Sequence, residues 1–448
     1  MSTILILFFV LGYIAITLEN PLKLDKTVPA LLMASIMWAF LAIGFNEGWL
    51  VVIDSEGNVC SILNQNASEG FQSILSHHFA ATAEILVFLI GAMTIVELID
   101  LHEGFDILKS FIRTKSKVKL LWILGISGFF LSAIIDNLTA TIVLISILRK
   151  LISRKEDRIW FASLIIIATN AGGAWSPIGD VTTTMLWIAN KVSAIGLMKN
   201  TILPSILCFV IPFFIASNLK AFNGKIDINA AENTNGNKLL SSKKMLIIGL
   251  LAIIFVPIFK TITHLPPYLG MIFSLGIVWL SSEFIHPEEN FDKSNKNYSV
   301  QNALSRIEIS SILFFLGILM AVAALESLSF GTINNQQVST LRFIAEKVAV
   351  TVPNTNIVIV LLGFLSAIVD NVPLVAATMG MFSQPIDHPI WHLIAYCAGT
   401  GGSILIIGSA AGVAAMGIEK IDFVWYLKNI SWLAIIGFLA GVLCFLVF

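Results

Sequence analysis

Three aspartates interrupt apolar stretches of the chain. Asp136, Asp180 and Asp370 each have no Lys or Arg within nine positions on either side. A charged side chain at the centre of a membrane costs about 2.5–3.5 kcal/mol, a cost that the fold alone has no reason to carry three times. Carboxylates in such surroundings indicate a site for a cation.

Neutral side chains with oxygen atoms accompany the aspartates in the same stretches and in one further segment. They are Asn137, Asn170, Thr182, Thr183, Ser366, Asn371, Ser403 and Ser409. Oxygen ligands without thiolates favour a hard ion such as sodium or lithium, and we place Na⁺ at Asp136, Asn137, Asp370 and Asn371. For each Ser or Thr the alternative is structural, because hydroxyls also bond to helix backbones.

The composition predicts an integral membrane protein. Of the 448 residues, 57% are hydrophobic and 12% are charged, against about 25% charged in an ordinary soluble domain. The formal net charge of −1, from 27 basic and 28 acidic residues, excludes nucleic acid as a partner. The four cysteines show no metal-site or disulfide spacing. We therefore expect one multi-pass, all-α domain in a lipid bilayer.

Twelve apolar segments must position these residues. They are 3–18, 27–45, 77–99, 119–149, 159–190, 201–219, 245–259, 268–285, 308–326, 357–383, 390–418 and 431–448. A simple spanning helix needs about 20 residues. The segments 119–149 and 357–383 are interrupted at their centres by Asp-Asn pairs.

The segment 119–149 is flanked by basic residues on both sides. They are Lys109, Arg113, Lys115, Lys117 and Lys119 before it, and Arg149, Lys150, Arg154, Lys155 and Arg158 after it. Under the positive-inside rule both ends are cytoplasmic, so the segment is predicted to be a re-entrant hairpin. No Lys or Arg occurs among residues 383–392, and the hairpin 357–383 is therefore expected to open to the outside.

Internal repetition of the sequence explains why the two hairpins are expected to open to opposite sides of the membrane. The stretch 132–137 matches 366–371, and the paired glycines at 172–173 match those at 401–402. We predict two inverted repeats, which are typical of secondary transporters. The first repeat is 1–219, with hairpin 119–149 and broken helix 159–190. The second repeat is 245–448, with hairpin 357–383 and broken helix 390–418. A cytoplasmic linker at 220–244 joins them.

The segments 159–190 and 390–418 are predicted to be broken helices. Adjacent glycines, with Pro177 and Gly179 in the first segment and Gly408 in the second, cannot sustain a regular helix. Open backbone inside a membrane must be buried in protein or line a watery cavity. Two hairpin tips and two breaks can therefore meet at one central ion site.

A candidate proton path lies on the third segment. Glu84, with His77 seven residues before it, could exchange protons near the outer face. The alternative is an interfacial glutamate that is solvated by loops.

The paired Ser-Ala-Ile-x-Asp-Asn hairpins and the segment 170–184 resemble the NhaD-type sodium/proton antiporters of the ion transporter superfamily, which also includes arsenite and dicarboxylate permeases. The resemblance covers nearly the whole chain. It implies exchange of Na⁺ or Li⁺ for H⁺ across a bacterial inner membrane, without a cofactor, by a homodimer whose scaffold holds two mobile transport units.

Residue-level matches to that family cover most of the candidate site. They are Asp136, Asn137, Asn170, Asp180, Thr182, Thr183, Ser366, Asp370 and Asn371, with His77 and Glu84 for the proton path. The internal repeat puts Gly399 opposite Asn170 and Ser409 opposite Asp180, so the second broken helix departs from the first.

Other functions are less compatible with these motifs. Dicarboxylate permeases have neutral hairpin tips, whereas a dianion here would face three carboxylates. An arsenite permease stays open as the alternative, because its substrate is neutral. An intramembrane aspartyl protease would need Gly at the position of Pro177 and a Tyr-Asp pair that the chain lacks, and an enzyme is therefore not expected. A channel is disfavoured because channels usually form their pores by subunit symmetry.

Overall fold

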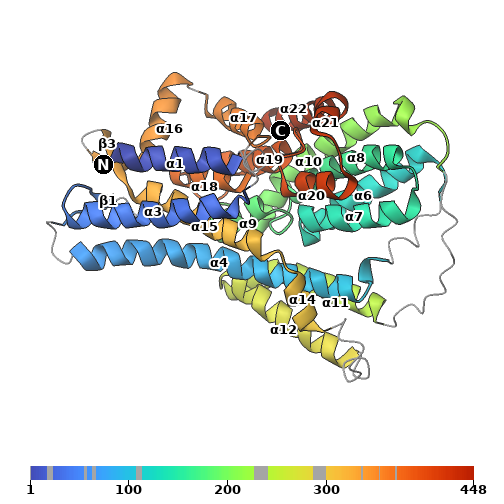
Figure 1. Cartoon of the computed structure of the whole chain (residues 1–448), viewed down its shortest axis with the longest axis horizontal. Coiled ribbons are helices and arrows are strands. Elements are labelled where there is room, and N and C mark those ends of the chain that lie inside the picture. The colour runs from blue at the N-terminus through green and yellow to red at the C-terminus, as the bar shows by residue number, and fades with distance from the viewer. Residues whose placement is uncertain are drawn as a thin grey trace. The chain divides into compact units, whose positions relative to one another are not determined.

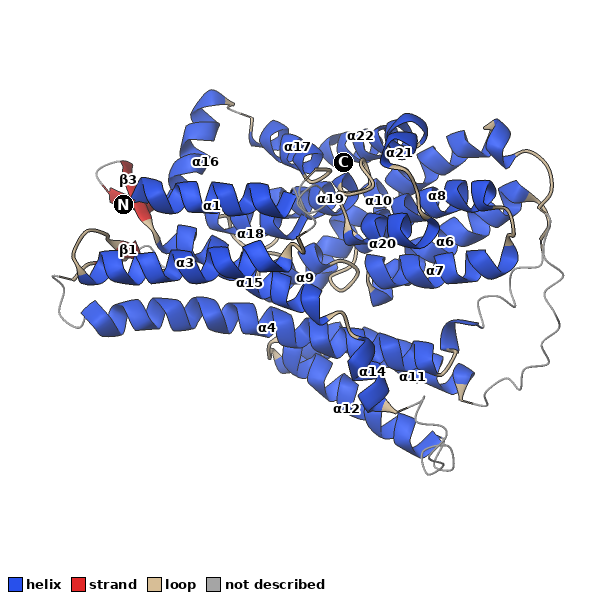
Figure 2. Cartoon of the chain, in the orientation of Figure 1, coloured by secondary structure: helices blue, strands red, loops and turns tan. Residues whose placement is uncertain are grey.

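The computed structural model consists almost entirely of helices (Figures 1 and 2). It describes residues 2–17, 24–54, 58–62, 67–106, 114–226, 241–285, 299–333, 336–352, 354–368 and 371–447. Within these ranges seven helices are long and apolar enough to cross a membrane, or eight if the bent pair α21 and α22 forms one span. The protein is thus a multi-pass membrane protein.

The chain forms two compact units, and each unit contains parts of both predicted repeats. Unit 1 comprises 1–86, 308–358 and 372–385, and unit 2 comprises 87–307, 359–371 and 386–448. The bounds of the repeats stay a prediction. The linker prediction at 220–244 falls mostly outside the described residues, as does Asp370.

Unit 1 contains helices and two small antiparallel hairpins. Its elements are α1 (Ser2–Thr17), α3 (Thr27–Asn46), β1 (Val52–Ile53), β2 (Val59–Cys60), the first part of α4 (Ala67–Leu101), α15 (Ile309–Ser327), β3 (Ser329–Ile333), β4 (Gln336–Ser339), α16 (Thr340–Thr351), the start of α17 (Thr355–Leu365) and most of α18 (Asn371–Met381).

Helices α3 and α15 form the centre of unit 1. The Trp38 indole donates to the Met320 carbonyl at 2.8 Å. Gly317 lies so close to α3 that a Cβ atom there would be 2.6 Å from the Ala30 carbonyl carbon. Small residues allow helix backbones to approach in this way.

Unit 2 contains the remaining elements. They are the rest of α4, η1 (Gly104–Asp106), α6 (Lys117–Ile135), α7 (Asn137–Leu151), α8 (Lys155–Gly173), α9 (Val181–Ile188), α10 (Ala194–Ser217), η2 (Lys220–Phe222), α11 (Ser242–Thr263), α12 (Pro267–Ile285), α14 (Val300–Arg306), most of α17, α19 (Pro389–Gly401), α20 (Ala410–Glu419), α21 (Phe423–Asn429) and α22 (Ser431–Val447).

The core of unit 2 is built around α8 and α19. Every residue from Phe161 to Gly173 is buried, and so is every residue from Trp391 to Gly401. A helix that is apolar on all sides is suited to such a central position. The helices that carry the predicted breaks are therefore the innermost ones.

The predicted hairpin 119–149 consists of α6 and α7, which pack on one another and on α8 (Figure 1). Lys117 at the start of α6 forms an ion pair with Asp157 at the start of α8, with Nζ 2.5 Å from Oδ1. The chain that leaves α7 thus returns to the end where α6 began. This geometry agrees with a segment that enters and leaves on one side.

Several elements of the fold were not predicted, and two of them show why. Helix α4 begins at Ala67, ten residues before the apolar segment 77–99, because hydropathy marks only the apolar part of a helix and polar residues extend it. The hairpin of β3 and β4 follows α15 directly. Its strands of five and four residues are too short to produce a hydropathy signal.

Candidate functional site

The break in the first interrupted span lies between Gly173, the last residue of α8, and Val181, the first residue of α9. A Cβ atom at Gly173 would lie 2.4 Å from the Gly179 carbonyl oxygen, so only glycine permits this tight turn. Asp180 then occupies the N-cap position of α9 with extended backbone, at φ −148° and ψ 149°. The turn thus places a carboxylate at a positive helix end.

The Asp180 carboxylate joins the tips of both predicted hairpins. Asn137 Nδ2 donates to Oδ1 at 3.1 Å and Asn371 Nδ2 donates to Oδ2 at 3.3 Å. The Thr182 hydroxyl also donates to Oδ2. Asp180 itself is 3% exposed. One buried carboxylate thus collects polar groups from residues 43 and 191 positions away.

The hydrogen bonds continue from Asn137 to the second break. Asn137 Nδ2 donates to Asn170 Oδ1 at 3.1 Å, and Asn170 Nδ2 donates to Ser409 Oγ at 3.0 Å. Ser409 is the N-cap residue of α20 and accepts from the Gly412 N–H at 3.1 Å. The polar core of unit 2 is therefore a chain of five buried side chains: Asn371, Asp180, Asn137, Asn170 and Ser409.

Asp136 lies at the turn between α6 and α7 and caps α7. Its two carboxylate oxygens accept from the backbone N–H and the hydroxyl of Thr139, at 2.9 and 2.8 Å. Its φ of +82° is rare for a residue other than glycine, and such conformations occur where the surroundings hold them. Thr139, which orients this carboxylate, was missed in the sequence. An Asp followed three residues later by Thr was the available signal.

Three predicted hydroxyls bond to backbone carbonyls. Thr183 donates to Asp180 O at 2.9 Å, Ser366 to Ala398 O at 2.9 Å and Ser403 to Thr400 O at 2.7 Å. This is the structural role that the sequence leaves open for them. Ser132, the repeat counterpart of Ser366, donates likewise to Thr169 O at 2.6 Å. The two segments that match in sequence, 132–137 and 366–371, therefore bond to α8 and α19 in the same way.

The candidate proton path lies in the other unit. His77 is exposed and Glu84 is half-buried, both in the part of α4 that belongs to unit 1. Asp370 lies outside the described residues. Ile368 and Asn371, the described residues on either side of it, belong to unit 2.

Comparison with known proteins identifies the family. A family model described as a citrate transporter matches residues 11–391. Sodium/proton antiporters 1 and 2 of Arabidopsis thaliana are 42% and 39% identical over 98% of this chain, covering 71% and 98% of their own lengths. The Na⁺/H⁺ antiporter NhaD of Vibrio cholerae is 29% identical over 96% of this chain and 88% of its own. The chain belongs to the NhaD-type antiporter family. This is a family of transporters, not of enzymes.

A solved structure supports the fold of this family member. The YdaH transporter of Alcanivorax borkumensis, whose topology is described as unusual, matches with a TM-score of 0.55 at 14% identity. The match covers 94% of this chain and 98% of that one. The polytopic helical fold predicted from the sequence is confirmed.

Proposed function

We propose that the chain exchanges Na⁺ or Li⁺ for H⁺ across a bacterial inner membrane. The observation that carries this proposal is the buried Asp180 carboxylate, which holds the amides of Asn137 and Asn371. Each amide comes from one of the two repeated Asp-Asn motifs. The names of the relatives, which refer to sodium and protons, support the same exchange.

Sodium and protons are proposed to compete for the same carboxylates. Burial disfavours a charged carboxylate, and either a proton or a sodium ion neutralises it. Asn137 and Asn371 now present their NH₂ groups to Asp180. An amide also has an oxygen, so the same side chains can turn to ligate sodium. We keep Asp136, Asn137, Asp370 and Asn371 as the proposed ligands, with Asp180 as the shared carboxylate.

Citrate is a second candidate substrate, because the matching family model is described as a citrate transporter. A citrate anion at this site would meet the buried Asp180 carboxylate, and charge repulsion in a low-dielectric environment is strong. We therefore favour a cation. Charge does not exclude arsenite, because it is neutral, and arsenite is therefore included in the test below.

Everted membrane vesicles provide that test. With a pH gradient established and reported by a fluorescent dye, added sodium or lithium should dissipate the gradient, whereas citrate and arsenite should not. Vesicles without the protein are the control. Dissipation by arsenite or citrate but not by sodium would refute the proposal.

A grid of sodium concentration and pH tests whether the two ions share a site. If they compete, the half-saturating sodium concentration should rise as the pH falls, while saturating sodium restores the maximal rate. A maximal rate that falls in acid at constant half-saturating sodium would indicate a separate proton path, for which His77 and Glu84 are the candidates. Glu84→Gln should shift the pH profile without removing sodium binding.

The resemblance to the family also leads us to propose a homodimer. The chain has a mass of 48.9 kDa, and light scattering of the detergent-solubilised protein should report twice that value. A monomer mass in several detergents would contradict the dimer and leave the exchange proposal intact.

A further inference from the structure

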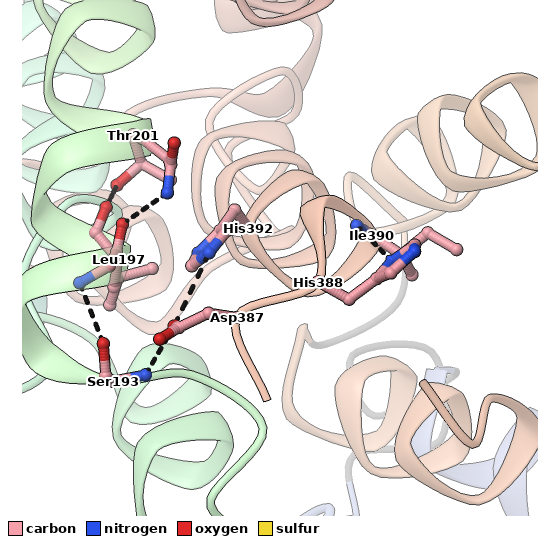
Figure 3. Close-up of polar contacts among 9 residues, drawn as sticks. Ser193, Leu197, Thr201, Asp387, His388, Ile390 and His392 are labelled. Carbon is pink, nitrogen blue, oxygen red and sulfur yellow. Dashed lines mark hydrogen bonds and ion pairs between the residues drawn. The ribbon is translucent and has the colours of Figure 1, made fainter. Parts of the chain in front are cut away.

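A further carboxylate in unit 2, outside the proposed ion site, is held in place by backbone groups. Asp387 lies in the loop before α19, where its N–H donates to Lys191 O at 2.9 Å and its Oδ1 accepts from the Ser193 N–H at 2.7 Å (Figure 3). Its φ of +59° is left-handed, a conformation that is uncommon for residues other than glycine but that Asp adopts more readily than most. Asp387 therefore ties the loop before α19 to the loop after α9.

Gly196 makes room for this carboxylate at the start of α10. A Cβ atom at Gly196 would lie 2.4 Å from Asp387 Oδ1. Ser193 caps α10 by accepting from the Gly196 N–H at 3.0 Å. The positive end of a 24-residue helix favours a negative charge at this position, and the Asp387 carboxylate is held there.

A buried imidazole faces that charge. His392, in the first turn of α19, is 1% exposed, and its Nε2 lies 3.6 Å from Asp387 Oδ1 (Figure 3). Among the described residues, neither of its ring nitrogens has a hydrogen-bond partner. Burying such a polar group unsatisfied is unfavourable. A proton on the ring would turn the contact with Asp387 into an ion pair.

We propose that His392 is a proton-binding residue of the exchanger and that Asp387 is its counter-ion. The proposal rests on the proposed function, since it makes the proton a substrate. A proton from water adds to the lone pair of the neutral ring and forms an imidazolium paired with the carboxylate; its release restores the neutral ring. The Asp387 side chain is 36% exposed, and the hairpin 357–383 before it is expected to open to the outside, which would give the pair a route to water.

Helix α19 connects this pair to the ion site. Gly399 follows His392 by seven residues, which is two helical turns or about 10 Å. A Cβ atom at Gly399 would lie 3.6 Å from Asp180 Oδ2. One buried helix thus carries the imidazole at its start and contacts the central carboxylate near its end. His392 was not predicted from the sequence, although it lies seven residues, or two helical turns, before Gly399.

The electrostatic surroundings of His392 are simple. The charges that act on the ring are the Asp387 carboxylate and the neighbouring His388. The helices that pack against α19 include α8, α9, α10, α17 and α22. Their ionisable residues are Lys155, Glu156, Asp157 and Arg158 at the start of α8, Lys199 and Cys208 on α10 and Cys444 on α22. Lys191 packs over the Trp391 ring at 5.0 Å.

The test compares His392→Gln and Asp387→Asn with a matched control, His388→Gln. His388 lies four positions away and accepts from the Ile390 N–H at 3.3 Å. The half-saturating sodium concentration is measured in vesicles across pH, because this is the quantity in which proton binding appears when protons and sodium compete. His392→Gln should remove one titration from this profile. Asp387→Asn should move its midpoint to lower pH by about one unit, because the imidazolium loses its partner. The control should keep the titration and should not move it to lower pH, because it removes a repulsive neighbour instead.

A titration of the ring itself separates this proposal from a folding effect. In full-length protein labelled with ¹³C-histidine, the one imidazole signal of the seven that His392→Gln removes should titrate, with a midpoint that falls in Asp387→Asn but does not fall in His388→Gln. A His392→Gln protein with the wild-type pH profile, or a ring that stays neutral throughout the active pH range, would overturn the proposal. Absence of sodium/proton exchange in the wild type would instead overturn the proposed function.

Discussion

The two helix breaks share one backbone design. Asp180 and Ser409 are N-cap residues with nearly equal dihedral angles, φ −148° and ψ 149° against φ −142° and ψ 152°. A Cβ atom at Gly172 would lie 2.1 Å from Phe129 O, and one at Gly401 would lie 2.1 Å from Gly363 O. Each break therefore needs glycine where a hairpin helix crosses it.

The two breaks differ in the side chains that they present. The first has Asn170 and Asp180, where the second has Gly399 and Ser409. Ser409 bonds to its own helix and to Asn170, whereas Asp180 receives both hairpin amides. The two breaks thus share a backbone geometry, and only the first carries a carboxylate. The second break is expected to shape the site and the first to provide its charge.

Neutralising the first break should have the largest effect. Asp180→Asn is expected to reduce sodium-dependent proton exchange in vesicles to background, because the shared carboxylate is lost. Stability should hold or rise, since a buried charge is removed. Expression and the unfolding temperature in detergent serve as controls. Full exchange by a well-folded Asp180→Asn protein would show that the two breaks do not divide their roles in this way.

Adding a methyl group at either break should lower the stability of the folded protein by a similar amount. In Gly172→Ala and Gly401→Ala the new Cβ meets a backbone carbonyl that cannot rotate away, and overpacking of this kind costs about 1–3 kcal/mol or more. Thermal unfolding in detergent measures the loss. Gly417→Ala in α20 is the matched control, because no described atom lies within 4 Å of its Cβ position. A wild-type unfolding temperature for Gly401→Ala would contradict the shared design.

The two hairpin tips should contribute unequally to sodium affinity. Asn137 makes two hydrogen bonds at 3.1 Å, to Asn170 and Asp180, while Asn371 bonds to Asp180 at 3.3 Å. Asn137→Ala should raise the half-saturating sodium concentration about tenfold, or ~1.4 kcal/mol, and Asn371→Ala less. The reverse order would assign the main ligands to the second repeat.

The smallest effect is expected for Ser409→Ala. This change removes one acceptor from Asn170 and a helix cap worth about 1 kcal/mol. Exchange should fall severalfold but persist, with a modestly lower unfolding temperature. Loss of all exchange in a stable Ser409→Ala protein would make the second break as important as the first.

Local sequence patterns predict many of the helices of this protein and the type of ion that it is expected to bind. Runs of apolar residues determine the membrane helices, and the paired glycines around 172 and 401 predict the two breaks that the structure contains. The aspartates in apolar surroundings indicate a cation whatever their partners are, because an uncompensated charge is expensive there. Elements and chemistry could therefore be predicted before any contact was known.

The distant partners of the polar side chains were decided by tertiary structure alone. In the sequence Asp136 and Asp180 look alike, yet Asp136 bonds to Thr139 three residues away, whereas Asp180 bonds to Asn371 at a separation of 191 residues. The contact between Asp387 and Ser193 spans 194 residues. Hydropathy and helical period report neighbours along the chain. Contacts of this range depend instead on how the buried helices α8 and α19 pack, and no local pattern contains that information.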